Sequence, residues 1–412
     1  MTIQTTLETV LRRAESNGWA GADPYDGLLS LVGKCAIPFG PAPRMAVIQA
    51  TLRSARFRNL ARPTGSINPK GLGLFLGAVL RGRDSLGLDR AASLGNELLE
   101  LLEKLAVREG TQRSWGYPFP WQSRFLWAPA GTPNAVATAT IGWHLLDWAQ
   151  HARAPLGRTA LARELGTGAA LFLSEKLTHS PVGTRASAVS YTTGDRSRIV
   201  NVSMLTARLL ARVARGAPAG DRTAVSPAQA DRMRGQISRL LRFALEAQRE
   251  DGTWPYSLES RGGWVDSFHT GFVLEALHDL REAGWQIPDE ALERGIAAYE
   301  GFFDRDGGGR LMLQPDSPFD AHSAAQGIVT YAALAAASGV PEAERLKARA
   351  CARRIARWCL DRLWLSDRGY FAYRIERGRR NEQEYTRWVQ AWMALGMSVA
   401  GQLERVHELA SV

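Results

Sequence analysis

The feature that most constrains the fold of this chain is a helical hairpin that repeats along almost its whole length. Long segments in which apolar residues recur three and four positions apart alternate with loops rich in glycine, proline, tryptophan and tyrosine. Strand-like alternation of apolar and polar residues is almost absent. The pattern predicts fourteen helices in seven pairs. They cover residues 2–16, 26–34, 44–60, 69–82, 87–108, 133–152, 156–178, 199–215, 226–249, 266–283, 288–304, 320–338, 341–363 and 384–403.

The second helix of each pair opens in a similar way, with a polar residue that follows an aromatic and glycine-rich loop and precedes small or apolar residues. The separations between these openings are 44, 64, 67, 65, 54 and 64 residues, which fits a helix pair with its loop. If each opening residue starts an inner helix, all of them lie around one mouth of the structure. The openings are Asp26, Lys70, Asn134, Asn201, Asp266, Asp320 and Glu384.

The composition of the helices indicates which of them are buried. The segment FHTGFVLEAL, which starts at Phe268, is apolar or small on almost every side, as in a helix covered on both faces. The segment 226–249 instead carries a strong charged stripe. We therefore expect an all-α protein, an α/α toroid of six to seven helical hairpins that forms a single domain over residues 1–412. An open solenoid of helical repeats is the alternative, but the irregular loops favour the closed toroid.

The amino-acid composition fits such a fold and excludes several other classes of protein. Hydrophobic residues make up 45% of the 412 residues and charged residues 22%, which permits a large core. No apolar stretch approaches the roughly 20 residues that a membrane-spanning helix needs, and the N-terminal segment is typical of an amphipathic helix rather than a signal peptide. The three cysteines form no CxxC pair and no disulfide framework. A cytoplasmic location is therefore expected.

The net charge of +10 does not by itself identify a partner. The arginines are dispersed over helix faces, and the sequence has no nucleic-acid-binding motif and no basic strand interleaved with aromatic residues. Nucleic acid is therefore not expected as a partner. The charge fits a solvated basic surface, and a polyanionic ligand such as a uronate-containing glycan or a phosphorylated carrier is the alternative.

The richest candidate site is the segment 251–272. Asp266 and His269 stand three positions apart in it, and thus on one face of a helix start. An aspartate there can hold the imidazole in one tautomer, which makes His269 a candidate general acid or base. The alternative is structural, because aspartate is a favoured N-cap and the pair could be a cap bonded to a buried histidine.

The next opening places Asp320, His322 and Gln326 in a similar arrangement. Asp266 and Asp320 come from neighbouring hairpins, and a pair of carboxylates on the two sides of a glycosidic bond would suit acid/base hydrolysis. The separation of the two groups decides between this chemistry and two independent helix caps.

A third candidate region is the aromatic loop 114–134. Aromatic rings among hydrogen-bonding groups suit a sugar-binding cleft, because the apolar faces of pyranose rings pack on indoles; the alternative is that these rings wedge helix ends together. The expected catalytic residues are Asp266, His269, Asp320, His322 and Tyr117. The expected substrate-binding residues are Trp115, Trp121, Arg124, Trp254, Tyr256, Trp264, Gln326, Arg387 and Trp388.

Several familiar sites are absent from the sequence. There is no GxxxxGK[ST] loop for a nucleotide phosphate. The glycine-rich stretch 71–77 lies within an expected helix and follows no strand, so it is not a dinucleotide fingerprint. No HExxH motif and no Cys/His cluster with zinc spacing occurs. No cofactor and no metal site is therefore expected.

One turn resembles a turn of the terpene cyclases and related toroids. In EAQREDGTWPYS, the residues Gln248, Asp251, Gly252 and Trp254 match its QxxDGxW pattern. The acidic DxDD motif by which squalene–hopene-type cyclases protonate their substrate has no match, since the nearest stretch is DRDGGG at 304–309. The resemblance implies a toroid fold without implying cyclase activity.

A broader resemblance is carried by the stretches WGYPFPWQSR, GTPNAVATA, DGTWPYS, WVDSFHTGFVLEAL, HSAAQG and RWVQAWM. Together they resemble toroid proteins associated with bacterial polysaccharide biosynthesis and, more distantly, six-hairpin glycosidases, polysaccharide lyases and glucuronyl epimerases. The resemblance spans roughly residues 19–400. It implies a glycan or glycan precursor as the ligand and the enzymes of polysaccharide biosynthesis as assembly partners, and it assigns no catalytic residue.

These features predict a carbohydrate-active toroid that works by hydrolysis, elimination or epimerisation. In a hydrolase, one of Asp266 and Asp320 is the acid and the other the base. In a lyase or epimerase, His269 or a tyrosine abstracts the proton beside a uronate carboxylate, which Arg124 or Arg387 neutralises.

Two rival functions stay open. A terpenoid cyclase-like or prenyltransferase-like toroid that binds an isoprenoid would have a cavity lined mainly by phenylalanine and leucine. A non-catalytic glycan-binding or assembly protein would have a mouth without two titratable groups within reach of one sugar.

Overall fold

The structure is a computed structural model that describes residues 2–152, 156–216 and 224–410. The helices of this part of the chain are α1 (Ile3–Ser16), α2 (Leu31–Ala36), α3 (Pro41–Arg53), α4 (Ala55–Ala61), α5 (Pro69–Leu86), α6 (Leu88–Leu105), α7 (Ala135–His151), α8 (Thr159–Glu175), α9 (Val200–Ala214), α10 (Pro227–Ala247), α11 (Ser267–Glu282), α12 (Asp289–Glu300), α13 (Ala321–Ala336), α14 (Glu342–Arg362) and α15 (Trp392–Ala410). Two short 3-10 helices, η1 (Asp26–Leu29) and η2 (Ile37–Phe39), and a π-helical turn, η3 (Thr386–Ala391), complete the helical elements.

The strands are short and lie in the loops. They are β1 (Ala20–Gly21), β2 (Ser66–Ile67), β3 (Val107–Glu109), β4 (Gln112–Ser114), β5 (Trp121–Gln122), β6 (Trp127–Ala128), β7 (His179–Val182), β8 (Ala186–Val189), β9 (Phe319–Asp320), β10 (Trp364–Leu365), β11 (Tyr370–Phe371), β12 (Arg374–Glu376) and β13 (Arg379–Asn381). All of them pair antiparallel, mostly as hairpins, and β9 joins the edge of the β12–β13 hairpin.

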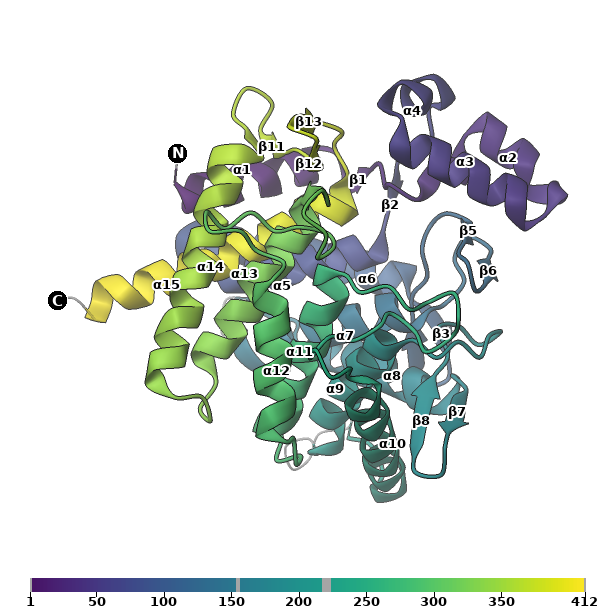
Figure 1. Cartoon of the computed structure of the whole chain (residues 1–412), viewed down its shortest axis with the longest axis vertical. Coiled ribbons are helices and arrows are strands. Elements are labelled where there is room, and N and C mark those ends of the chain that lie inside the picture. Colours follow the sequence, from purple (N-terminus) through teal and green to yellow (C-terminus); the bar gives the residue numbers. More distant parts are fainter. Residues whose placement is uncertain (1, 153–155, 217–223, 411–412) are drawn as a thin grey trace.

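Six inner helices form a closed ring. In order around the ring they are α5, α7, α9, α11, α13 and α15, each of which contacts the next, and α15 returns to contact α5. The outer helices α6, α8, α10, α12 and α14 each pack on the inner helix that precedes or follows them, and α1 packs on α15. The N-terminal and C-terminal helices therefore lie together and close the circle (Figure 1). The prediction of an α/α toroid is confirmed, with six hairpins in the ring.

Burial follows the two kinds of sequence that distinguish the helices. The inner helix α13 is buried along nearly its whole length, from Ala321 to Ala335, because neighbours cover it on every side. The outer helix α10 buries one stripe, in which Met233, Ile237 and Leu240 recur at three- and four-residue spacing. Its charged residues stay at the surface.

The inner helices begin at the same end of the ring, and polar side chains cap several of them. Asn134, Asp266 and Asp320 each accept a hydrogen bond from a backbone N–H group in the first turn of α7, α11 and α13. Three expected openings are shifted: Lys70 and Asn201 lie in the first turns of α5 and α9 rather than before these helices, and Glu384 lies outside the ring in an ion pair. Side chains from the first turns of α5, α7, α9, α11 and α13 line one cavity together with η3, which directly precedes α15, as expected for helices that open at a common mouth.

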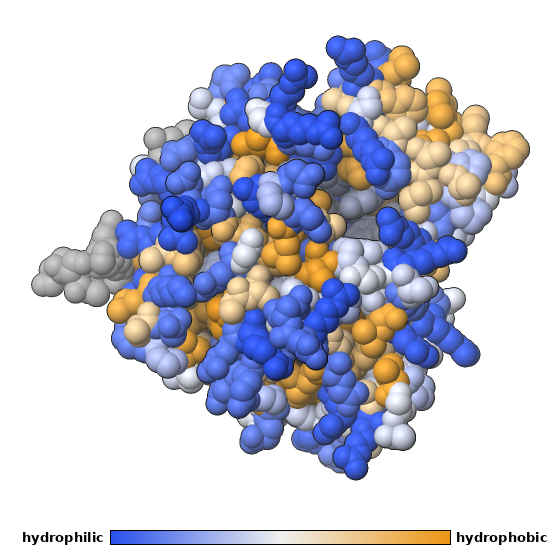
Figure 2. Space-filling model, viewed as in Figure 1, coloured by the Kyte–Doolittle hydropathy of each residue, from blue (hydrophilic) through white to orange (hydrophobic). Residues whose placement is uncertain are grey.

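The expected helix pair 26–34 and 44–60 is not part of the ring. This region forms η1, α2, η2, α3 and α4, which stand apart from the hairpins beside the mouth (Figure 1). Asp26 does not open an inner helix, because its buried carboxylate pairs with Arg58 of α4 at 2.7 Å. Leu28, Val47 and Ile48 form a small core of this region, separate from that of the ring. Leu31, Phe39 and Leu60 are 79%, 75% and 81% exposed. The apolar surface over α2–α4 is visible in Figure 2.

The turn that resembles the terpene cyclase pattern has a structural role. The Gln248 side chain donates hydrogen bonds to the carbonyl oxygens of Gly252 and Ala291, which ties the end of α10 to α12. Gly252 has a φ of 81°, and a Cβ there would meet the Arg294 carbonyl oxygen, so the turn requires glycine. None of the helices in the described ranges is long and apolar enough to cross a membrane.

Candidate functional site

A cavity of about 410 Å³ occupies the mouth of the ring, and we call it the mouth cavity. Its floor is formed by the first turns of the inner helices, and its walls by the loops between hairpins and by α3. Aromatic side chains make up much of the wall. They are Tyr25, Tyr117, Phe119, Trp121, Phe125, Tyr191, Tyr256, Trp264, Phe268, Phe272 and Trp388.

Several of these rings lie parallel and present flat surfaces. Tyr256 and Trp264 stack at 4.5 Å between centroids and 13° between planes, and Phe125 continues the stack beside Trp264. The guanidinium of Arg124, which is exposed at the rim, lies 5.2 Å from the Trp264 ring. This side of the mouth cavity offers an aromatic platform with a cation at its edge, which suits the apolar face of a sugar ring.

Asp266 and His269 form a hydrogen-bonded pair at the start of α11. The His269 Nδ1 atom lies 2.6 Å from Asp266 Oδ2, while Asp266 Oδ1 accepts the His269 backbone N–H at 3.0 Å. The Trp264 indole N–H donates to the same carboxylate at 3.2 Å. A carboxylate partner places the proton of the neutral imidazole on Nδ1, which leaves Nε2 as the atom that accepts a proton. Asp266 is thus both a helix cap and the partner that orients His269.

His322 is buried in an aromatic cage at the start of α13. It stacks on Phe268 at 4.4 Å and on Trp392 at 4.5 Å, and Trp388 meets it edge-on. Neither of its ring nitrogens has a hydrogen-bond partner among the described residues. Burial holds the pKa of His322 well below its usual range, and the positive charges of Lys70 and Arg387 act in the same direction. The imidazole is therefore neutral, with one N–H available to a ligand.

Lys70 extends from the first turn of α5 into the same cavity. Its side chain is buried, and Nζ lies 5.4 Å from the centroid of Trp392 and 5.7 Å from that of Phe272. No hydrogen bond or ion pair joins the Lys70 amine to any residue in the described ranges. Burial lowers the pKa of Lys70 to about 7, with Arg387 adding to the effect and Asp23 opposing it. A large share of this amine is uncharged at neutral pH.

Arg387 lines the mouth cavity, but its charge is already paired. Its Nε and Nη2 atoms donate to the two carboxylate oxygens of Asp23 at 2.5 and 2.7 Å. Both side chains are buried, and the guanidinium also lies over the rings of Tyr117 and Trp388. The Tyr117 hydroxyl is 3.0 Å from that of Tyr191. The Arg387 charge is thus neutralised by Asp23, whereas the exposed Arg124 at the rim is placed to meet an anionic ligand.

Ten of the fourteen expected site residues line the mouth cavity. They are Tyr117, Trp121, Arg124, Tyr256, Trp264, Asp266, His269, His322, Arg387 and Trp388. The structure thus brings together residues from α11, α13, η3 and two loops, as expected from the common mouth.

Two expected tryptophans lie in the core instead. Trp115 is fully buried, and its indole N–H donates to the Leu102 carbonyl oxygen of α6. Trp254 donates to the Ala244 carbonyl oxygen of α10 and packs where a Cβ on Gly295 would stand. Neither indole lines the mouth cavity, because both anchor loops to outer helices.

Asp320 and Gln326 also lie away from the cavity wall. Asp320 is buried as the cap of α13, and its Oδ1 accepts the backbone N–H groups of His322 and Ser323. Burial raises its pKa to about 6. Gln326 is one turn deeper, where its amide donates to Glu275 and Thr330 inside the ring. A carboxylate pair of Asp266 and Asp320 facing one ligand is therefore not what the geometry offers.

Some residues of the site were not singled out from the sequence. Lys70 was noted only as a helix opening, although a lone lysine among the apolar residues of α5 is the signal that could have revealed it. Asn201 lines the cavity with a buried Oδ1 that lacks a partner among the described residues. The cavity is also lined by Met45, Ile48 and Gln49 of α3. The sequence did not indicate them, because its pattern assigned this segment to a hairpin of the ring.

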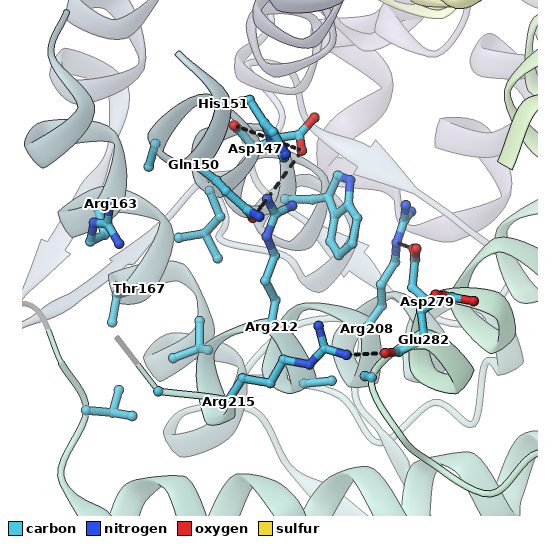
Figure 3. Close-up of a pocket in the computed structure, with 18 of the residues that line it drawn as sticks. Asp147, Gln150, His151, Arg163, Thr167, Arg208, Arg212, Arg215, Asp279 and Glu282 are labelled. Carbon is cyan, nitrogen blue, oxygen red and sulfur yellow. Dashed lines mark hydrogen bonds and ion pairs between the residues drawn. The ribbon is translucent and has the colours of Figure 1, made fainter. Parts of the chain in front are cut away.

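A second cavity, of about 730 Å³, lies at the opposite end of the ring, where α7, α9 and α11 end (Figure 3). We call it the distal cavity. Asp147 accepts from Arg81 at 2.8 Å and lies 3.3 Å from both Arg212 and His151. Burial opposes ionisation of Asp147, but these partners outweigh it and hold its pKa well below the usual range. A small void lined by Phe272 and other side chains lies between the two cavities.

The distal cavity is polar, and several of its charged side chains are paired with one another. Arg208 pairs with Asp279 and lies 3.3 Å from Glu275. Arg215 donates to the Glu282 carbonyl oxygen. In Figure 3 Arg208 points toward Asp279, and Arg215 points toward the backbone of Glu282. Their arrangement joins neighbouring inner helices.

Solved structures with the same architecture include enzymes that act on carbohydrates. A GH76 α-mannanase from Bacteroides thetaiotaomicron matches with a TM-score of 0.59 and 13% identity, over 84% of this chain and 89% of its own. A cellobiose 2-epimerase from Bacillus thermoamylovorans matches with a TM-score of 0.57 and 12% identity, over 82% and 88%. An unsaturated glucuronyl hydrolase specific for heparin matches with a TM-score of 0.55 and 12% identity, over 98% of both chains.

The similarity lies in the fold. No protein-family model and no curated protein sequence matches this chain. The structure is similar in fold to toroids that include hydrolases and an epimerase, and the expected distant structural resemblance to this group is confirmed. The chemistry of this chain has to be argued from its own mouth cavity.

Proposed function

We propose that this protein isomerises or epimerises a sugar by moving a proton at a carbon next to a carbonyl group. The observation that carries the proposal is the mouth cavity, where an oriented imidazole and a second, neutral imidazole flank Phe268 on an aromatic-walled site. Its volume of about 410 Å³ falls within the range of about 300–1,000 Å³ for small-molecule sites. The stacked rings of Tyr256 and Trp264 supply a surface for a pyranose face.

His269 is the proposed general base. Its Nδ1 is bound to Asp266, so Nε2 carries the lone pair that takes the proton from carbon. Asp266 stabilises the imidazolium that forms and keeps the ring in place, as a buried carboxylate does for other histidine bases. His269 then returns the proton to the same carbon or to its neighbour, which gives an epimer or an isomer.

His322 is the proposed hydrogen-bond donor to the carbonyl oxygen. A neutral imidazole can stabilise the negative charge that develops on this oxygen when the proton leaves carbon. Its ring nitrogens have no partner among the described residues, so a ligand would satisfy them. The low pKa that burial gives His322 keeps it in the neutral form that this role requires.

The geometry favours this chemistry over the other candidates. Hydrolysis by two carboxylates needs a second acid that faces the ligand, and Asp320 is used to cap α13. An isoprenoid site needs a mainly aliphatic and phenylalanine-lined wall, whereas this wall carries Lys70, His269 and His322. With these groups around one cavity, a role in binding alone is the weaker account.

The test is solvent exchange at carbon. The protein is incubated in D2O with cellobiose, an α-linked mannobiose and a heparin-derived disaccharide, and proton NMR follows the carbon-bound hydrogen beside the carbonyl group. Enzyme-dependent loss of that signal, with or without a new epimer, is the expected result for at least one sugar. Binding of a sugar without exchange would instead support a glycan-binding protein, and cleavage of the disaccharide would support a hydrolase.

A further inference from the structure

Lys70 differs from every other lysine of the chain. The others are Lys34, Lys104, Lys176 and Lys347, and all of them are exposed. Lys176 and Lys347 also pair with glutamates, whereas the Lys70 amine has no acidic partner among the described residues. A buried ammonium without a partner is costly, so its place in the fold needs an explanation.

The surroundings of Lys70 disfavour its charged form from several sides. Arg387 of η3 and His322 of α13 lie close enough to interact with it, and the aromatic rings of Phe272 and Trp392 complete the contacts. Asp23 is the acidic group that acts on Lys70, and its carboxylate is already bound to Arg387 through both oxygens. The first turn of α5, where Lys70 sits, also adds the positive end of a helix dipole.

An amine that is uncharged at neutral pH is a nucleophile. Lys70 lines the same cavity as the two histidines, and it shares the rings of Phe272 and Trp392 with His322. An acid or base for proton transfers at the amine is therefore at hand.

We propose that Lys70 forms an imine with the carbonyl carbon of an aldehyde or ketone ligand in the mouth cavity. This inference deepens the proposed function and rests on its carbonyl-bearing ligand. It adds a covalent step and defines the ligand class as a sugar in its open-chain form, because a closed ring has no free carbonyl group.

The step balances without an oxidant or a reductant. The lone pair of Nζ forms a bond to the carbonyl carbon, and the carbonyl π electrons move to oxygen, which takes up a proton. The nitrogen then loses a proton to His269, and its lone pair expels the hydroxyl group as water after the resulting His269 imidazolium has protonated that group. The resulting iminium withdraws electrons from the adjacent carbon, which makes the proton that His269 removes more acidic. Addition of water reverses the sequence and releases the product.

The test is trapping of the imine in the folded wild-type protein. Glycolaldehyde is the probe, because it is a two-carbon aldehyde with a hydroxyl group, and sodium cyanoborohydride reduces any imine to a stable secondary amine. Peptide mass spectrometry then compares modification at Lys70 with that at Lys104. At pH 7 we expect Lys70 to react about tenfold faster or more, because a larger fraction of its amine is uncharged. Equal rates, or modification of Lys104 with Lys70 untouched, would overturn the proposal.

A pair of variants separates the imine from a purely electrostatic role. Lys70→Arg keeps a positive charge but forms no stable imine, and Lys104→Arg is the matched control on the surface of α6. We expect deuterium exchange into the sugar to fall at least about a hundredfold in Lys70→Arg and to stay unchanged in Lys104→Arg. Full exchange in a folded Lys70→Arg protein would overturn the imine and leave the proposed function intact. Trapping at Lys70 in a protein that shows no exchange with any sugar would support the imine and count against the proposed function.

Discussion

The two ends of the toroid hold cavities that differ in what their charges do. The distal cavity is larger, about 730 Å³ against about 410 Å³, yet its arginines and carboxylates bind one another. In the mouth cavity both ring nitrogens of His322 are buried without a hydrogen-bond partner among the described residues, and the side chain of Lys70 is buried beside them. Charges that neutralise one another stabilise a fold, whereas buried polar groups without partners cost stability and persist where a ligand uses them. This difference supports the smaller cavity as the proposed site.

The difference also follows from the direction of the inner helices. Their N-termini meet at the mouth, where free N–H groups and the helix dipoles favour polar and anionic groups. Their C-termini meet at the distal end, where the partial negative charge of the helix dipoles stabilises cations. Arg81 and Arg212 lie toward this end and pair with Asp147. The same architecture thus presents a ligand-ready surface at one end and a set of ion pairs at the other.

The largest effect that we expect is on activity. His269 and His151 are a matched pair, since each lies beside an aspartate, the first in the mouth cavity and the second in the distal cavity. His269→Asn should lower the rate of deuterium exchange by about 10²–10⁴-fold, because it removes the general base. His151→Asn should leave the rate unchanged. A comparable loss in both variants would erase the functional distinction between the two ends.

The next effect is on stability at the distal end. Asp147→Asn should lower the free energy of unfolding by about 3 kcal/mol, because it leaves Arg81 and Arg212 without their shared carboxylate. The control is Glu100→Gln, which removes the exposed partner of Arg158 and should cost less than about 1 kcal/mol. Denaturant unfolding measures both. An Asp147→Asn protein as stable as the control would show that the distal ion pairs do not hold the ring together.

A change of the opposite sign is expected at the mouth. Lys70→Met should raise the free energy of unfolding by about 2 kcal/mol at pH 6, because it replaces a buried cation with an apolar side chain of similar length. The folded-state pKa of Lys70, about 7, lies below the ordinary lysine value of 10.5, so the unfolded chain binds more protons than the folded chain between these two values. The free energy of unfolding of the wild-type protein therefore rises with pH between these values. The difference in free energy of unfolding between Lys70→Met and the wild type should shrink toward pH 10. An advantage that does not change with pH would contradict an unpartnered amine at this site.

The smallest effect separates the two roles of Asp266. Asn caps a helix nearly as well as Asp, so Asp266→Asn should change stability by only a few tenths of a kcal/mol, whereas Asp266→Ala should cost about 1 kcal/mol. Both variants should lose exchange activity, because neither carries the charge that orients His269 and stabilises its imidazolium. An active Asp266→Asn protein would mean that Asp266 is a cap alone.

The ring itself could be predicted because its signal is local. Three- and four-residue apolar spacing marks each helix, and the caps Asn134, Asp266 and Asp320 mark the starts of three inner helices. The prediction of the first hairpin was wrong because Asp26 resembles such a cap in the sequence. Its carboxylate instead pairs with Arg58, 32 positions away along the chain.

The finer details of the site depend on contacts that no local pattern encodes. Trp254 and Trp264 stand in the same loop, yet one packs on Gly295 of α12 and the other lines the cavity. The pairing of Arg387 with Asp23 joins residues 364 positions apart and removes a cation that was expected to meet the ligand. In the sequence Lys70 is an ordinary residue of a helix, and its burial results from the packing of the ring around it. Tertiary packing decides each of these cases.

The most direct test of the account is a footprint of the ligand on the two cavities. Hydroxyl-radical oxidation of tryptophan side chains is measured by mass spectrometry with and without a saturating amount of the sugar that undergoes exchange. Trp121 and Trp264 of the mouth cavity and Trp143 of the distal cavity are all partly exposed, so all three can report. We expect protection of Trp121 and Trp264 with no change at Trp143. Protection of Trp143 with the mouth tryptophans unchanged would place the ligand at the other end and contradict it.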